Sequence, residues 1–163
     1  MVKKIFSAKI LLFSIFILGA ILRFYKLGEV PQVLTRDEAA IGYNAYSILK
    51  TGKDEYGVKL PVYFLSFGDY KNPLYIYLTS LLIPVFCLNE FTVRFLSALS
   101  GSLTIIASYL LIKEFFSKTQ KGTEDKQKRT EPVALMASFL LAISPWHIFY
   151  SSLNFIYFKF FYL

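Results

Sequence analysis

The chain has 163 residues, of which 55% are hydrophobic, 18% are aromatic and only 18% are charged, a balance outside the range of soluble domains. The net charge of +7 does not indicate nucleic-acid binding, because the sequence has no nucleic-acid motif and no basic helix face. One cysteine, Cys87, excludes an intramolecular disulfide, and one histidine, His147, excludes a histidine-rich metal site within this chain. The composition predicts an integral membrane protein.

Residues 1–23 are predicted to form the first transmembrane helix. Lys3 and Lys4 precede an apolar run that is interrupted only by Lys9. A secretory signal peptide begins with the same pattern. The small-x-small cleavage site is missing, however, and the basic and aromatic sequence RFYK follows directly. These features favour a retained anchor whose amino terminus lies in the cytoplasm.

Residues 24–92 are predicted to form one long loop outside the membrane. Glycine and proline turn signals recur along it, together with many tyrosine and phenylalanine residues. Loops longer than about 12 to 15 residues are usually either functional or disordered. The aromatic content argues against disorder, so we expect an ordered outer loop that packs on other parts of the protein.

Within this loop, the sequence LTRDEAAIGYNAYSILKTG predicts an amphipathic helix over 36–50. Thr35 and Glu38 have the spacing of a capping box, and Asp37 lies in the first turn, where the helix dipole favours negative charge. Gly52 suits a left-handed helix end. Capping requires the same residue types that catalysis would use, so the local pattern alone leaves both roles open for the two acidic residues.

The apolar segment 73–88 also belongs to the outer loop. It is shorter than the roughly 20 residues that cross a bilayer, and it contains Pro73 and Pro84. Whether this segment spans the membrane stays open. We favour an interfacial or re-entrant helix, because the charge distribution of the following segments then obeys the positive-inside rule.

The remaining chain predicts two further spans separated by a basic connector. Residues 93–112 contain the small-residue stretch SALSGS and predict a second transmembrane helix. Residues 113–132 are polar and predict a flexible cytoplasmic loop. Residues 133–152 predict a third transmembrane helix, whose outer end is marked by the sequence SPWH. The aromatic tail 153–163 has no stop signal, which predicts a truncated portion of a longer protein.

The fold class expected from these elements is an all-α integral membrane protein. It has about three transmembrane helices and a long outer loop with juxtamembrane and interfacial helices. The expected location is the plasma membrane, with several passes. The bilayer is therefore the first expected partner.

Four motifs, in this order, resemble a known clan of enzymes. They are the acidic pair in PQVLTRDEAAIGYNAYSILKTGKDEYG, then FGDYKNPLYIYL, then FTVR before FLSALSGSLTIIASYLLIKEFF, and finally AISPWHIFYSS. Together they look like the amino-terminal part of the protein O-mannosyltransferase and aminoarabinose transferase clan, of bacterial or archaeal type. Its members are polytopic glycosyltransferases of the GT-C fold that use polyprenyl-phosphate sugars. The resemblance covers roughly residues 23–152.

In that clan the first outer loop carries the active site. The resemblance implies that Asp37 is the catalytic base and that Glu38 has a supporting role beside it. It also implies that the chain works on a polyprenyl-phosphate-linked sugar at the outer membrane face. A divalent metal ion is the one cofactor that the resemblance raises. The sugar, the lipid carrier and the acceptor do not follow from the sequence.

The motif DYKNP looks like the region where relatives have a Glu-Lys-Pro sequence that binds the lipid phosphate or a metal. This implies substrate-binding roles for Asp69 and Lys71. The match is imperfect, because Tyr70 separates the acid from the base and Asn72 precedes the proline. Arg94 is similar to the arginine at the entry of the next span and is also predicted to bind substrate.

Sugar transfer from a polyprenyl phosphate requires a base for the acceptor proton and a cation for the departing phosphate. Lys71 or Arg94 would hold the phosphate, and Tyr43 is predicted to stack on the sugar. Each residue also has an ordinary alternative. Lys71 suits a snorkelling lysine, Arg94 a helix-end anchor and Asp69 a turn residue, while the loop tyrosines suit packing onto the bilayer.

Two hypotheses follow from the sequence. In the first, the chain is a membrane glycosyltransferase, or an inactive amino-terminal fragment of one. In the second, it is a non-catalytic membrane protein or assembly subunit in which Asp37 and Glu38 only cap a helix. Asp37→Asn would abolish transfer under the first hypothesis. Under the second, Asp37→Asn and Glu38→Gln would cost at most on the order of 1 kcal/mol of helix stability.

Overall fold

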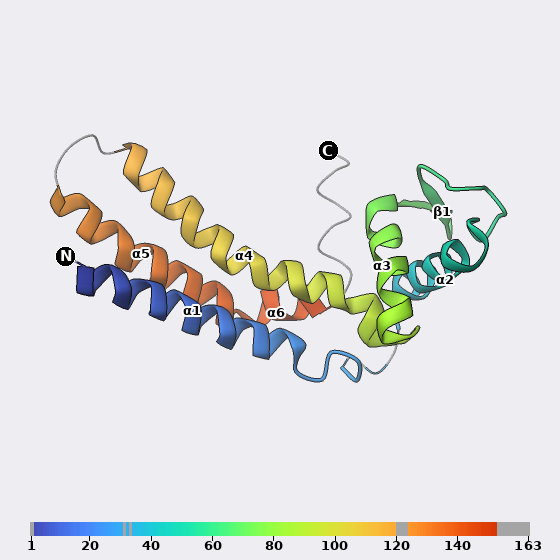
Figure 1. The fold of residues 1–163 in the computed structure, drawn as a ribbon, viewed down its shortest axis with the longest axis horizontal. Helices are drawn as coiled ribbons and strands as arrows, with labels where there is room; N and C mark the ends of the chain where they lie inside the picture. The colour runs from blue at the N-terminus through green and yellow to red at the C-terminus, as the bar shows by residue number, and fades with distance from the viewer. Residues whose placement is uncertain (1, 31, 33, 120–123, 153–163) are drawn as a thin grey trace. The chain divides into compact units, whose positions relative to one another are not determined.

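The fold is described from a computed structural model, in which residues 2–30, 32, 34–119 and 124–152 are described; for 2–7, 117–119 and 124–129 this description covers the backbone alone. The protein is mainly helical, as expected, with one small antiparallel hairpin in addition (Figure 1). The chain divides into two compact units. Of the described residues, unit 1 contains those within 2–25 and 99–149, and unit 2 contains those within 26–98 and 150–152.

Unit 1 contains α1 (Val2–Phe24), α5 (Glu124–Ile143), most of α4 (Glu90–Thr119) and most of α6 (Pro145–Ser152). The helices α1 and α5 run side by side (Figure 1). Ile15, Ile105 and Ala142 form the buried core of this unit. Gly19 permits a close approach here, because a Cβ added to it would lie 2.3 Å from the Ile105 Cδ1 atom.

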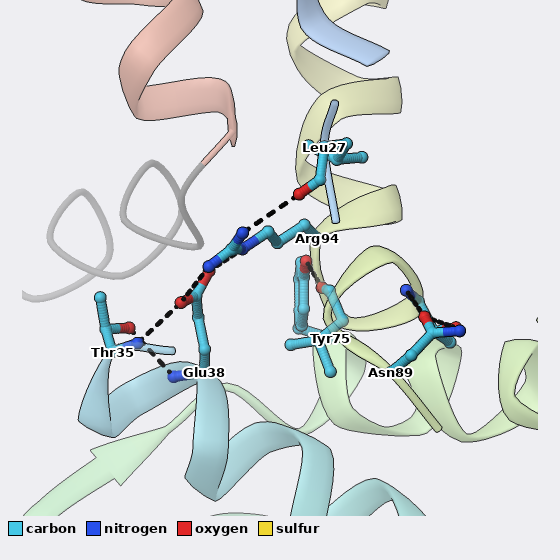
Figure 2. A network of polar contacts seen from close by, with 8 residues as sticks. Leu27, Thr35, Glu38, Tyr75, Asn89 and Arg94 are labelled. Atoms are coloured by element: carbon cyan, nitrogen blue, oxygen red, sulfur yellow. Dashed lines mark hydrogen bonds and ion pairs between the residues drawn. The ribbon is translucent and has the colours of Figure 1, made fainter. Parts of the chain in front are cut away.

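Unit 2 is built on α2 (Arg36–Thr51) and α3 (Pro73–Phe86), which pack against each other. The hairpin of β1 (Phe64–Ser66) and β2 (Asp69–Lys71) precedes α3. Buried side chains from these elements and from the start of α4 form the hydrophobic core of unit 2. They are Ile41, Ala45, Ile48, Phe64, Tyr75, Ile76, Ile83 and Val93. The Tyr75 hydroxyl donates a hydrogen bond of 2.7 Å to the Val93 carbonyl, which joins α3 to α4 (Figure 2).

The hairpin was not expected from the sequence. Phe64 pairs with Lys71 and Ser66 with Asp69, and the two-residue turn between the strands is formed by Phe67 and Gly68. Both turn residues have positive φ angles, 52° and 79°, as a type I′ hairpin turn requires. Because side chains alternate along a strand, Phe64, Ser66 and Lys71 share the buried face of the hairpin.

The basic segment 113–132 is largely helical, which corrects its interpretation as a flexible loop. Helix α4 continues through Thr119 and α5 begins at Glu124. Only residues 120–123 stand between them, and these lie outside the described residues, as does the predicted tail 153–163. Lysine, glutamate, glutamine and arginine all favour helices, so a charged composition indicated solvent exposure here and not the absence of a helix.

One helix within the described residues, Glu90–Phe116, is long and apolar enough by itself to cross a membrane. A second candidate is broken, because Thr130–Ile143 and Pro145–Ser152 meet that standard only together and are bent by 57° at the break. The predicted third span, 133–152, is therefore two helices. The predicted first span forms α1 but is not among these candidates, so three transmembrane helices stay a prediction.

Candidate functional site

The predicted helix start at the acidic pair is present in unit 2. Thr35 is the N-cap of α2, and its side chain accepts a hydrogen bond from the Glu38 amide. The Glu38 carboxylate in turn accepts one of 2.8 Å from the Thr35 amide, which completes the capping box (Figure 2). At the other end, Gly52 has a φ of 69° and ends the helix in the left-handed conformation.

Glu38 also forms a buried ion pair with Arg94. The Arg94 Nε and Nη2 atoms donate to the two Glu38 carboxylate oxygens at 2.8 and 3.2 Å, and Nη1 donates to the Leu27 carbonyl at 3.1 Å (Figure 2). Both side chains have an exposed fraction of 0%. Asn89 accepts a hydrogen bond from the Thr92 amide in the first turn of α4, and Arg94 lies in the turn that follows. The fork-to-fork geometry joins α2, α4 and the segment after α1 within unit 2.

Asp37 has a different environment, although it is the next residue to Glu38. Consecutive helix residues point about 100° apart, so the two carboxylates leave the helix in different directions. The Asp37 side chain is 45% exposed, and its Oδ1 atom lies 2.6 Å from the Lys71 Nζ atom. The Asp69 Oδ2 atom lies 3.1 Å from the same nitrogen and belongs to a side chain that is 73% exposed. We name Asp37, Lys71 and Asp69 the acid–lysine cluster.

Lys71 is the buried centre of this cluster, with a side chain that is 4% exposed. It is buried because it lies on the inner face of the hairpin opposite Phe64. Burial by itself lowers the pKa of a lysine, but hydrogen bonds and charge from Asp37 and Asp69 outweigh it, so the pKa of Lys71 is raised above its ordinary value of 10.5. The lysine therefore stays charged and holds both carboxylates in place.

A divalent metal ion does not fit the cluster. Its two carboxylates converge on the Lys71 ammonium group, which already occupies the position between them and would repel a second cation. Among the described residues, no group of three or more histidine, cysteine, aspartate or glutamate side chains is arranged to hold a metal ion. We therefore derive no step of the chemistry from a metal.

The six predicted site residues are thus divided into three places in unit 2. Asp37, Asp69 and Lys71 lie together, Glu38 and Arg94 lie together in the interior, and Tyr43 stands apart. Tyr43 is exposed and follows Asp37 by six residues on α2, so the two side chains leave the helix roughly 120° apart.

Arg36 was not among the site residues predicted from the sequence. Arg36 is exposed and immediately precedes Asp37, and its guanidinium carbon lies 5.4 Å from the centre of the Phe67 ring at the hairpin turn. Such a cation–π contact orients a long side chain without using its hydrogen-bond donors. The available signal was its position next to a candidate base, but no local pattern indicates a ring 31 residues away in the sequence.

The segment between α2 and the hairpin is ordered, as predicted, while its location outside the membrane stays a prediction. Asp54 accepts hydrogen bonds from the Tyr56 and Val58 amides, at 3.0 and 2.8 Å. Asn44 on α2 accepts a bond from the Glu55 amide and donates another to its carboxylate. These bonds connect the loop to the helix that carries the acidic pair.

Comparison of the sequence with protein-family models found no match, and comparisons with curated proteins and with solved structures found none either.

Proposed function

We propose that this chain carries the active-site loop of a membrane glycosyltransferase. In this proposal it moves a sugar from a polyprenyl-phosphate donor to an acceptor hydroxyl at the outer membrane face. The observation that carries the proposal is the acid–lysine cluster: an accessible Asp37 carboxylate is held by a buried lysine on an ordered loop between apolar helices. The motif resemblance supplies the reaction class.

Asp37 suits the role of base because it is both positioned and accessible. In the proposed step, the acceptor hydroxyl gives its proton to Asp37 while its oxygen bonds to the sugar's anomeric carbon. The bond between that carbon and the phosphate oxygen breaks, and the polyprenyl phosphate leaves with the bonding electrons. A base contributes only if it is within hydrogen-bond reach of the proton. The Lys71 contact restricts the carboxylate without covering its exposed side.

The departing phosphate requires a cation, and the structure alters which side chain suits this role. Arg94 is fully buried against Glu38, and the Lys71 ammonium is engaged by two carboxylates. Arg36 is exposed beside Asp37, and its planar guanidinium suits two-point contact with phosphate. We therefore assign the phosphate contact to Arg36, and Lys71 becomes the residue that positions the base.

Helix α3 supports placement of unit 2 at a bilayer surface. Its exposed stripe is entirely apolar, while its buried side contains two hydroxyl groups that bond to backbone carbonyls; the stripe is Leu74, Leu78, Leu81 and Val85, and the hydroxyls belong to Thr79 and Ser80. A surface helix in water has the opposite arrangement. With 14 residues, α3 is about 21 Å long and shorter than the roughly 30 Å hydrocarbon core, as an interfacial helix would be.

The decisive experiment compares Asp37→Asn with Asp69→Asn in the protein reconstituted into liposomes with a polyprenyl-phosphate sugar. Both variants remove one charge from the same cluster and keep a side chain that can accept from Lys71. We expect Asp37→Asn to lower transfer by roughly 10²- to 10⁴-fold, the usual contribution of a general base, and Asp69→Asn to retain most activity. Equal rates for Asp37→Asn and the unmodified chain would remove Asp37 from the mechanism.

A non-catalytic membrane protein is the second candidate, and the environment of Glu38 favours it. This residue completes the capping box and pairs with Arg94, so half of the acidic pair has a structural role. Under this candidate, unmodified chain supplied with a range of polyprenyl-phosphate sugars would show neither transfer nor lipid-sugar binding. Binding that weakens in Arg36→Met but not in Lys59→Met, another exposed cation of unit 2, would favour the transferase.

Sidedness provides an independent test. With Cys87→Ser as the background, a membrane-impermeant thiol reagent applied to intact cells should label a cysteine at position 59 in the loop. A cysteine at position 121, in the basic segment, should stay unlabelled. The reverse pattern would place the cluster in the cytoplasm, where an outer-face transferase has no access to its donor.

A further inference from the structure

Unit 1 contains a second buried arginine, Arg23, at the end of α1. Its side chain has an exposed fraction of 0%, and none of its hydrogen bonds to the described residues is to a carboxylate. Instead, the guanidinium donates to three backbone carbonyls and contacts the one histidine of the chain, His147. A charged group in such an apolar unit is costly unless its donors are satisfied.

Two of the carbonyls that Arg23 contacts belong to the break between α5 and α6. Pro145 has no amide hydrogen, so it cannot bond to the carbonyl four residues earlier, which is that of Leu141. Ser144 immediately precedes α6, and its carbonyl accepts a hydrogen bond of 2.9 Å from the Ile148 amide. The break therefore leaves the Leu141 carbonyl without its helical partner, which is unfavourable in an apolar environment.

Arg23 supplies the missing donors. Its Nη2 atom lies 3.2 Å from the Leu141 carbonyl oxygen, and Nη1 lies 3.2 Å from the Ala142 carbonyl oxygen. Nη1 also donates to the Gly19 carbonyl of its own helix at 2.8 Å. The positive charge thus lies at the carboxyl end of α5, where the helix dipole favours it.

His147, in the first turn of α6, completes the arrangement. Its Nδ1 atom lies 2.7 Å from Arg23 Nη2, and an arginine can only donate, so Nδ1 must be the acceptor and carry no proton. The ring proton is then on Nε2, which lies 3.3 Å from the Thr104 oxygen. The Thr104 hydroxyl donates its own hydrogen to the Gly101 carbonyl, which leaves its lone pairs able to accept.

We propose that Arg23 and His147 form a clamp that holds the broken helix in its bent form and that closes only while the imidazole is neutral. The clamp comprises Arg23 from α1, the two carbonyls of α5, His147 from α6 and Thr104 from α4. A protonated imidazole has no acceptor at Nδ1 and would place a second positive charge against Arg23. Arg23 and Thr104 are the only side chains within hydrogen-bond distance of the His147 ring among the described residues. Protonation of His147 therefore opens the clamp.

The single histidine makes a direct test practicable. The full chain, labelled with ¹⁵N only at histidine and placed in lipid nanodiscs, should give NMR signals of one unprotonated Nδ1 and one protonated Nε2. In Arg23→Met, the Nδ1 signal should move because its donor is gone. A protonated Nδ1 in the unmodified chain, or an Arg23→Met spectrum identical to it, would overturn the clamp. Lys26→Met, which removes a neighbouring exposed cation, is the matched control and should leave the spectrum unchanged.

A double-mutant cycle tests the clamp by a second route. Pro145→Ala restores an amide that can bond to the Leu141 carbonyl, so Arg23 should matter less in that background. We expect Arg23→Met to raise the unfolding equilibrium constant about tenfold more with Pro145 present than with Pro145→Ala, as expected for hydrogen bonds to a charged group. Equal effects in the two backgrounds would show that Arg23 does not act through the break. If Arg23→Met prevents folding, Arg23→Lys, which cannot reach both carbonyls with one planar fork, replaces it in the cycle.

Discussion

Two neighbouring carboxylates of unit 2 have opposite environments. Glu38 is fully buried and paired in two-point geometry with Arg94, and its remaining bond caps the helix. Asp37 is half exposed and bonds to Lys71, which it shares with Asp69. The Glu38–Arg94 pair bonds only to protein groups in the contacts described above, so we assign it a role in stabilising the fold. The Asp37 carboxylate keeps one side open to a ligand, so we assign it the catalytic role.

The difference comes from desolvation. Removing one member of a buried pair leaves a charge without water or a partner, whereas exposed carboxylates can be rehydrated. The same kind of substitution should therefore have very different effects on stability at the two places.

The largest effect is expected from Arg94→Met, which leaves Glu38 buried without its partner. We expect the free energy of unfolding to fall by about 3–5 kcal/mol, measured by denaturant titration in detergent micelles. Adding Glu38→Leu should recover part of this loss, because the uncompensated charge is then removed as well. If the two substitutions are additive, the pair does not act as a unit.

Lys71→Met should have a smaller effect of about 1–2 kcal/mol, because Asp37 and Asp69 are accessible to water and their contacts with Lys71 are partly screened. This free energy of unfolding is also measured by denaturant titration in detergent micelles. Sugar transfer should fall more than stability, since the base loses the group that positions it. A loss of stability as large as that of Arg94→Met would erase the contrast between the two places.

Thr35→Ala removes the hydroxyl that accepts from the Glu38 amide but leaves the pair with Arg94 intact. The expected cost is about 1 kcal/mol, as for other N-cap substitutions. Thr51→Ala, which changes the same side chain at the other end of α2, is the control and should cost less. A loss several times larger would indicate that Thr35 positions the buried pair and does not only cap the helix.

The smallest effect is on the pH dependence of stability. The pKa of Lys71 is raised above 10.5 in the folded protein, so its contribution is fully present below the unfolded value and is lost as pH rises through the folded value. Unfolding measured at pH values from 9 upward should show stability falling above about pH 10.5. This decline should be shallower in Lys71→Met, and an unchanged decline would mean that other groups cause it.

Local sequence patterns predicted both ends of helix α2, which carries the acidic pair. The three-residue spacing of Thr35 and Glu38 and the glycine at 52 are sufficient to place both ends of α2, because capping involves residues within a few positions of each other. The sequence SPWH was interpreted as the outer end of a span, and the chain bends there by 57° between α5 and α6. The sequence did not indicate that carbonyls at this bend bond to a side chain from another helix.

The roles of the two acidic residues were not predictable in this way. The sequence left capping and catalysis open for both Asp37 and Glu38, and it left either Lys71 or Arg94 as the cation for the phosphate. Arg94 is 56 residues from Glu38, and Lys71 is 34 residues from Asp37. No spacing rule indicates which cation meets which carboxylate, because this depends on how α2, the hairpin and α4 pack.

The sequence by itself determined the apolar character of the chain, the start and end of α2 and the presence of an acidic pair, since composition and capping are local properties. Only the tertiary structure decided that one acidic residue is a buried structural partner and that its neighbour is accessible. The physical reason is that burial of a charge depends on what surrounds it in space. Packing that brings distant residues together sets that environment.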